Sequence, residues 1–205
     1  MKKKKNFNYK FKNFLNEENY FVNDTNVNAF NGLFNNNFQN YFLYGPKKSG
    51  KSFLGQIWLK KNNAIQLKNN FKSIIKNNRN VMIDRLTAFN EEKVFHLVNN
   101  CILKNLKILI ISDKKINEIS FGFNDLSSRL KTFYNLEIGK PDDEMLLTIL
   151  TKLLSERQFI INSKDIFEYI LRRVDRSYQG INNIVTKLDI LSLEKKRQLT
   201  IPLIK

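Results

Sequence analysis

Residues 41–54 read Tyr-Phe-Leu-Tyr-Gly-Pro-Lys-Lys-Ser-Gly-Lys-Ser-Phe-Leu: an apolar run, a polar loop bounded by glycines, and the start of a helical pattern. This spacing, between a strand and a helix, is that of a phosphate-binding loop. The glycines let successive backbone N–H groups face a polyphosphate, and the positive end of the helix adds to the attraction. Lys51 would reach the terminal phosphates, and the Ser52 hydroxyl suits Mg²⁺. The predicted nucleotide contacts are Gly45, Pro46, Lys47, Lys48, Ser49, Gly50, Lys51, Ser52 and Phe53.

Length and composition indicate a globular chain with one full domain and a small second one. The chain has 205 residues, 42% of them hydrophobic, and no run that is long and apolar enough to span a membrane. The basic start, residues 1–5, is followed by polar residues rather than by the apolar core of a signal peptide. Cys101 is the single cysteine, which excludes an internal disulfide and is typical of a reducing compartment. We therefore expect a cytoplasmic protein.

The net charge of +16 raises the question of nucleic-acid binding. Lysine and asparagine are scattered through the whole chain, and no predicted helix carries one dense basic face. The pattern favours a generally basic, solvated surface over a specific DNA site. Non-specific, salt-sensitive attraction to DNA needs no dedicated site and is expected.

Two later apolar runs end in polar side chains of the kind that phosphate-loop proteins use. Residues 81–84 form a predicted strand that delivers Asp84 to the outer shell of Mg²⁺. ATPases of this kind usually place a second acid next, and this chain has Arg85, so we expect weak intrinsic hydrolysis. Residues 107–113 predict another strand, whose tip at Ser112 and Asp113 would emerge where ligands bind in open α/β sheets.

The pattern changes to purely helical after Gly139-Lys140-Pro141. Helices are predicted from about residue 142, from about residue 163, and over residues 178–195, and shorter strands over 64–67 and 133–138. The expected fold class is α/β, with a parallel sheet flanked by helices and a small C-terminal helical lid. The expected division is an arm (1–19), a nucleotide-binding core (20–140) and a lid (141–205).

With these parts in order, the chain resembles AAA+ domains of the DnaA superfamily, and most closely its Hda-like members. The resemblance is carried by Tyr44-Gly45-Pro46 through Leu54, by Phe95-His96-Leu97, and by Asp125-Leu126 with Ser128-Arg129-Leu130. It continues through Lys140-Pro141-Asp142-Asp143-Glu144 and the ending Lys196-Arg197-Gln198-Leu199-Thr200-Ile201-Pro202-Leu203. The sequence given stops there, without the DNA-binding domain of the initiator.

The resemblance implies roles for individual residues. Lys51 and Ser52 match the Walker A pair, Asp84 the Walker B acid, and Ser112-Asp113 sensor 1, with ADP or ATP and Mg as ligands. Arg129 matches an arginine finger that acts on a neighbour's nucleotide. The sensor 2 arginine falls best on Arg176, with Arg172 and Arg173 as alternatives. Phe21, Val22 and Asn26 would line the adenine site.

The arm holds an alternating segment, Asn6-Phe7-Asn8-Tyr9-Lys10-Phe11, with Asn6 where Hda-like proteins carry glutamine in a motif for the DNA polymerase sliding clamp. Such a segment could seat Phe7, Tyr9 and Phe11 in pockets of a partner. A flexible tail or an edge strand explains the pattern equally well.

The resemblance thus predicts a regulator that inactivates DnaA by promoting hydrolysis of its bound ATP, coupled to the clamp, with a homo-oligomer as a further option. Two alternatives stay open: an autonomous ATPase or loader, and a non-enzymatic adaptor between the clamp and DnaA.

Overall fold

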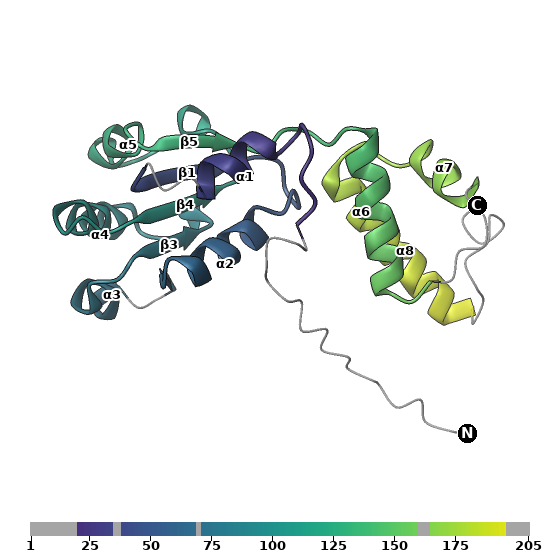
Figure 1. The fold of residues 1–205 in the computed structure, drawn as a ribbon, viewed down its shortest axis with the longest axis horizontal. Helices are drawn as coiled ribbons and strands as arrows, with labels where there is room; N and C mark the ends of the chain where they lie inside the picture. Colours follow the sequence, from purple (N-terminus) through teal and green to yellow (C-terminus); the bar gives the residue numbers. More distant parts are fainter. Residues whose placement is uncertain (1–19, 35–37, 69–70, 160–164, 196–205) are drawn as a thin grey trace, which may run out of the picture.

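The computed structural model describes residues 20–34, 38–68, 71–159 and 165–195. Its N-terminal part is a five-stranded, fully parallel sheet with helices on both faces, and its C-terminal part is helical (Figure 1). The strand order is β2-β3-β4-β1-β5. The strands are β1 (Asn40–Tyr44), β2 (Ile65–Gln66), β3 (Val81–Asp84), β4 (Ile108–Ser112) and β5 (Tyr134–Glu137).

Each face of the sheet is covered by helices, because neighbouring residues of a strand point to opposite faces. Phe42 of β1 belongs to one buried cluster, with residues of α3 (Phe71–Asn77), α4 (Glu91–Leu103) and α5 (Asn124–Leu130). Leu43, the next residue, belongs to the other cluster, with residues of α1 (Val27–Phe34) and α2 (Lys51–Lys61). All five residues of β4 are buried, as expected of a central parallel strand.

The C-terminal part has its own buried cluster, drawn from α6 (Asp143–Glu156), α7 (Asp165–Leu171) and α8 (Tyr178–Lys195). Asp142 caps α6, since its carboxylate accepts a hydrogen bond from the Met145 N–H at 2.7 Å. Met145 and Tyr178 belong to the cluster of α1 and α2, so their side chains join the helical part to the sheet.

The α/β fold with a parallel sheet and C-terminal helices is confirmed, and the strands predicted at 64–67, 81–84, 107–113 and 133–138 match β2, β3, β4 and β5 to within one residue at each end. The helix predicted over 178–195 matches α8. The structure adds two short 3₁₀ turns, η2 (Leu86–Ala88) and η3 (Ile116–Glu118). The predicted arm, residues 1–19, and the tail, residues 196–205, lie outside the described residues. No helix among the described residues is long and apolar enough to cross a membrane.

Candidate nucleotide-binding site

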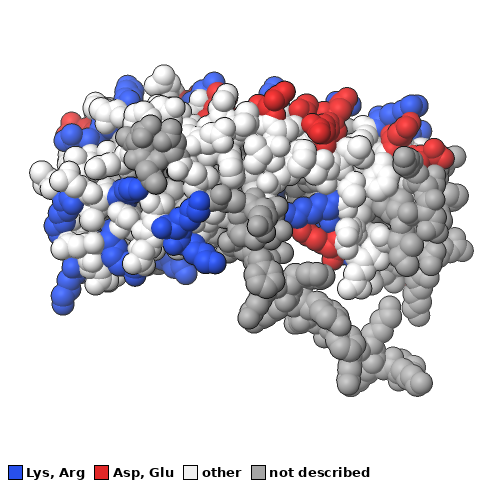
Figure 2. All heavy atoms as spheres, viewed as in Figure 1, with Lys and Arg blue, Asp and Glu red and all other residues white. Residues whose placement is uncertain are grey.

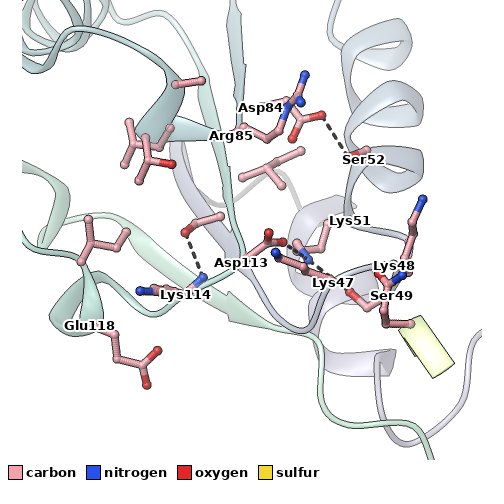
Figure 3. A pocket seen from close by; sticks show the side chains of 18 of the residues that line it. Lys47, Lys48, Ser49, Lys51, Ser52, Asp84, Arg85, Asp113, Lys114 and Glu118 are labelled. Atoms are coloured by element: carbon pink, nitrogen blue, oxygen red, sulfur yellow. Dashed lines mark hydrogen bonds and ion pairs between the residues drawn. The ribbon is translucent and has the colours of Figure 1, made fainter. Parts of the chain in front are cut away.

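A cavity of about 950 Å³ lies at the carboxyl ends of β1, β3 and β4 (Figure 3). This is the edge at which open parallel sheets bind ligands. The phosphate loop forms one wall and the segments after β3 and β4 form the other. The charged and polar lining residues include Lys47, Lys48, Lys51, Ser52, Asp84, Arg85, Asp113, Lys114, Glu118 and Gln179.

Two glycines of the loop occupy positions that a side chain would not fit. Gly45 has φ 155°, and a Cβ atom there would lie 2.5 Å from the Ile138 carbonyl oxygen. Gly50, with φ 89°, is the residue before the first turn of α2, and a Cβ atom would meet the Tyr20 ring at 3.0 Å. Gly45 therefore allows the close approach of the loop to Ile138, and Gly50 adopts a left-handed backbone that other residues reach only with strain.

Lys51 is 6% exposed and its ammonium is held by the loop itself. Its Nζ donates hydrogen bonds to the carbonyl oxygens of Gly45 at 2.8 Å and Pro46 at 2.6 Å. It also pairs with Asp113 Oδ1 at 3.0 Å (Figure 3). A buried cation with several oxygen partners is well suited to a polyphosphate, whose oxygens can replace the Asp113 carboxylate. Asp113 is thus the acidic partner of the buried Lys51 ammonium at the end of β4.

Ser52 and Asp84 meet across the cavity, the Ser52 hydroxyl donating to Asp84 Oδ2 at 2.9 Å. A hydroxyl and a carboxylate are ligands that Mg²⁺ prefers, so this pair fits the metal. Among the described residues there is no group of three or more His, Cys, Asp or Glu side chains that could hold a metal ion alone. Phosphate oxygens and water would have to complete the coordination, as is usual for Mg²⁺.

Arg85 follows Asp84 in a left-handed conformation, with φ 59° and ψ 67°, and lines the cavity. The position next to Asp84 thus contributes a cation where water activation calls for a carboxylate. Glu91 does not replace it, because its Oε2 accepts a hydrogen bond from the Phe123 N–H at 2.8 Å. Glu118 lines the cavity, although its Oε2 also accepts from the Lys115 N–H at 3.2 Å.

The residues predicted for the adenine site lie outside this cavity lining. Asn26 is buried and holds the preceding turn together: its Nδ2 donates to the Phe21 carbonyl at 2.9 Å, and its Oδ1 accepts from the Asn23 N–H at 3.0 Å. Phe21 is 38% exposed. Tyr20, the residue before Phe21, stacks on Phe53 beside the loop, with ring centroids 6.1 Å apart. Burial raises the pKa of the Tyr20 hydroxyl well above its usual range.

None of the three candidate sensor 2 arginines is among the cavity-lining residues. Arg176 forms an ion pair with Asp143, and Arg172 pairs with Glu168 at 3.3 Å. Arg173 lies over the Tyr169 ring, 3.7 Å from its centroid. The described lid residue that does line the cavity is Gln179, in the first turn of α8. Its Nε2 donates to Asn183 Oδ1 at 2.7 Å. Because the resemblance predicted an arginine at this place, the neutral amide of Gln179 was not among the predicted site residues.

Arg129, the predicted finger, lies on α5 away from the phosphate cavity. It is exposed and lines a separate hollow of about 270 Å³ together with Phe95, Asp125, Ser128 and Thr132. Within the described parts of the chain, no acidic side chain pairs with its guanidinium. Phe7, Tyr9 and Phe11 fall in the arm, outside the described residues.

Comparisons with known proteins agree with this arrangement. Residues 142–205 match the family model of the Hda lid domain. The chromosomal replication initiator protein DnaA of Buchnera aphidicola subsp. Cinara cedri is 27% identical over 205 residues, covering 84% of this chain and 47% of the relative. The chain thus spans about half the length of that curated relative.

Solved structures show the same fold at low sequence identity. Domain III of the Thermotoga maritima initiation protein DnaA superimposes with a TM-score of 0.75 at 17% identity, covering 91% of this chain and 92% of that one. AMPPCP-bound DnaA from Aquifex aeolicus gives 0.65 at 19% identity, covering 88% and 68%. The chain therefore shares the fold of DnaA domain III, and its residues 142–205 are similar to the Hda lid domain.

Proposed function

We propose that this chain is a nucleotide-dependent regulator of replication initiation that inactivates DnaA by promoting hydrolysis of DnaA-bound ATP. The observation that carries the proposal is the separation of two features. The phosphate cavity has its own loop, Lys51 and Asp84, whereas the exposed Arg129 lines a different hollow. An arginine outside its own chain's cavity can act only on a nucleotide held by another subunit.

The ligand of the chain's own cavity would be ADP or ATP. Backbone N–H groups of the loop and Lys51 would hold the phosphates, and Ser52 with Asp84 would hold Mg²⁺. When bound, Mg²⁺ neutralises part of the phosphate charge. Lys51 exchanges its contact with Asp113 for a phosphate oxygen, which releases the carboxylate. That exchange gives nucleotide binding a direct consequence at the end of β4.

Acting in trans, the Arg129 guanidinium would neutralise charge that develops on the transferred phosphoryl group of DnaA-bound ATP. Fingers of this type contribute roughly 10³- to 10⁵-fold in rate. The chain's own turnover would stay slow, because Arg85 cannot polarise water as a carboxylate does. This contrast favours a regulator over an autonomous ATPase or loader.

The remaining partner of the proposal is the DNA polymerase sliding clamp, bound through Phe7, Tyr9 and Phe11 of the arm as an extended segment. Its support is the alternating sequence of residues 6–11 and the Hda lid match. Clamp binding would couple inactivation of DnaA to ongoing DNA synthesis. A chain lacking residues 1–12 should lose affinity for the clamp, and unchanged affinity would remove the arm from the proposal.

The central experiment compares Arg129→Ala with Lys131→Ala, an exposed cation two residues away. Each variant is mixed with DnaA–ATP and clamp-loaded DNA, and released ADP is followed over time. We expect Arg129→Ala to bind nucleotide normally and to lose stimulation by roughly 10³-fold, the low end of what finger arginines contribute. Lys131→Ala should keep it. Equal stimulation by both variants would exclude Arg129 as the finger.

A further inference from the structure

Acidic residues are absent from one long part of the chain. Between residues 25 and 83 there is no Asp or Glu, although all 19 acids of the protein lie elsewhere. The same stretch holds nine cations: Lys47, Lys48, Lys51, Lys60, Lys61, Lys68, Lys72, Lys76 and Arg79. Three of these belong to the phosphate loop. The other six are on α2 (Lys60 and Lys61), on α3 (Lys72 and Lys76), after β2 (Lys68) and between α3 and β3 (Arg79).

The fold gathers several of these cations at the amino ends of the strands, at the opposite end of the sheet from the phosphate cavity. Lys60 is in the last turn of α2, Lys76 in the last turn of α3, and Arg79 precedes β3. Lys104, just after α4, joins them from a later part of the sequence. We call Lys60, Lys76, Arg79 and Lys104 the amino-end surface; all four are exposed.

Hydrogen bonds join the loops at this end of the sheet and hold the side chains of Arg79 and Lys104 in place. Arg79 donates through Nε to the Asn63 carbonyl at 3.0 Å and also contacts Asn63 Oδ1. Lys104 Nζ donates to Asn78 Oδ1 at 2.6 Å. Asn80 links the loops, donating to the Asn62 carbonyl at 2.8 Å. Each partner is a neutral oxygen, so the positive charge is positioned without being cancelled.

No acidic side chain of the described residues pairs with any member of the amino-end surface. Figure 2 shows the consequence: around α2 and α3 the coloured atoms are blue, whereas red atoms gather along the upper edge and over the helical part. Lysines near helix C-termini suit the helix dipole, which explains some of the placement. It does not explain the complete absence of acids over 59 consecutive residues.

We propose that the amino-end surface is a docking site for the phosphate backbone of duplex DNA, independent of the nucleotide cavity. Lysine, arginine and asparagine side chains are the groups that contact DNA phosphates without reading sequence. Arg79 and Lys104 are held in place before binding, so less side-chain entropy is lost on contact. The nucleotide cavity lies at the opposite end of the sheet, so DNA and nucleotide can be bound at the same time.

The test measures the affinity for a fluorescent duplex by anisotropy between about 50 and 200 mM salt, because the logarithmic slope counts neutralised phosphates at about 0.9 each. The variant is Lys76→Gln with Arg79→Gln and Lys104→Gln. The matched control is Lys93→Gln with Lys131→Gln and Lys187→Gln, three exposed lysines elsewhere. We expect the first triple variant to reduce the slope by about 2.7 and the control by less than about 1.

Equal loss of slope in both triple variants would overturn the assignment, since it would reduce DNA binding to net charge. Tighter binding of the wild-type chain to phosphatidylserine vesicles than to the duplex would overturn DNA as the occupant. Lys60→Glu is a second test, since it changes one exposed side chain at the end of α2. This variant should bind the duplex about tenfold or more weakly, and unchanged affinity would contradict the proposal. Nucleotide binding by each variant serves as the check on folding.

Discussion

The lid residue that contacts the bound nucleotide should be Gln179 and not Arg176. Gln179 lines the phosphate cavity, and its amide is oriented by the 2.7 Å hydrogen bond to Asn183. Arg176 instead pairs with Asp143, with exposed fractions of 59% and 76% for the two side chains. An ion pair this exposed contributes about 0–1 kcal/mol to the free energy of unfolding. Substitution of Gln179 and substitution of Arg176 should therefore have clearly different effects on nucleotide affinity.

A hydrogen bond to a charged group contributes about 1.5 kcal/mol at the lower end of the measured range. Gln179→Ala should therefore weaken ATP binding by about tenfold. Arg176→Ala should change the affinity by less than about twofold, because its partner is Asp143 and not phosphate. Titration calorimetry with ATP and Mg²⁺ measures both dissociation constants. A tenfold loss in Arg176→Ala with no change in Gln179→Ala would refute the reasoning.

Three more results are expected. Lys51→Ala should lower ATP affinity about 10- to 100-fold, from about 1.5–3 kcal/mol of charged hydrogen bonding, and Lys60→Ala, an exposed lysine at the other end of α2, should change it little; equal losses would contradict the geometry. Arg85→Glu should raise phosphate release by the chain alone, and Arg85→Gln should not; no gain would mean that another group limits turnover. Burial raises the pKa of the Cys101 thiol to about 11. At about pH 8 a thiol reagent should therefore react with Cys101 of the folded chain at least about 100-fold more slowly than with the chain unfolded in guanidinium chloride. Rapid labelling of the folded chain would show that the region around Cys101 opens.

Local sequence patterns predicted the sheet because the relevant forces act over short stretches of chain. The apolar run before Gly45 and the continuous run at residues 108–112 are each long enough to identify a buried strand. The loop at residues 45–52 has a spacing of glycine, lysine and serine that few other structures share. These signals also predicted that Ser52 and Asp84 lie close together, since the loop before Ser52 follows β1, Asp84 ends β3, and both strands end at the same edge of the sheet.

The lid contact could not be predicted in the same way. Periodicity identifies the apolar face of residues 178–195, but the rotation of α8 over the cavity is set by packing between distant parts. Tyr178 and Met145 dock into the cluster formed by α1 and α2, and that docking places Gln179 at the phosphate cavity. The amino-end surface could not be predicted from the sequence for the same reason. Arg79 and Lys104 are 25 residues apart in sequence, and they share a surface only because parallel strands align their amino ends.

The two cationic ends of the sheet should act almost independently. A five-residue strand such as β1 spans about 17 Å, whereas charges in about 0.15 M salt are screened over about 8 Å. Direct electrostatic coupling between a bound nucleotide and bound DNA is therefore weak. The shared element is α2, whose first turn holds Lys51 and whose last turn holds Lys60. Saturating ATP should thus change the affinity for duplex DNA by less than about twofold at physiological salt. A larger change, lost in Lys51→Ala, would show that α2 moves when nucleotide binds.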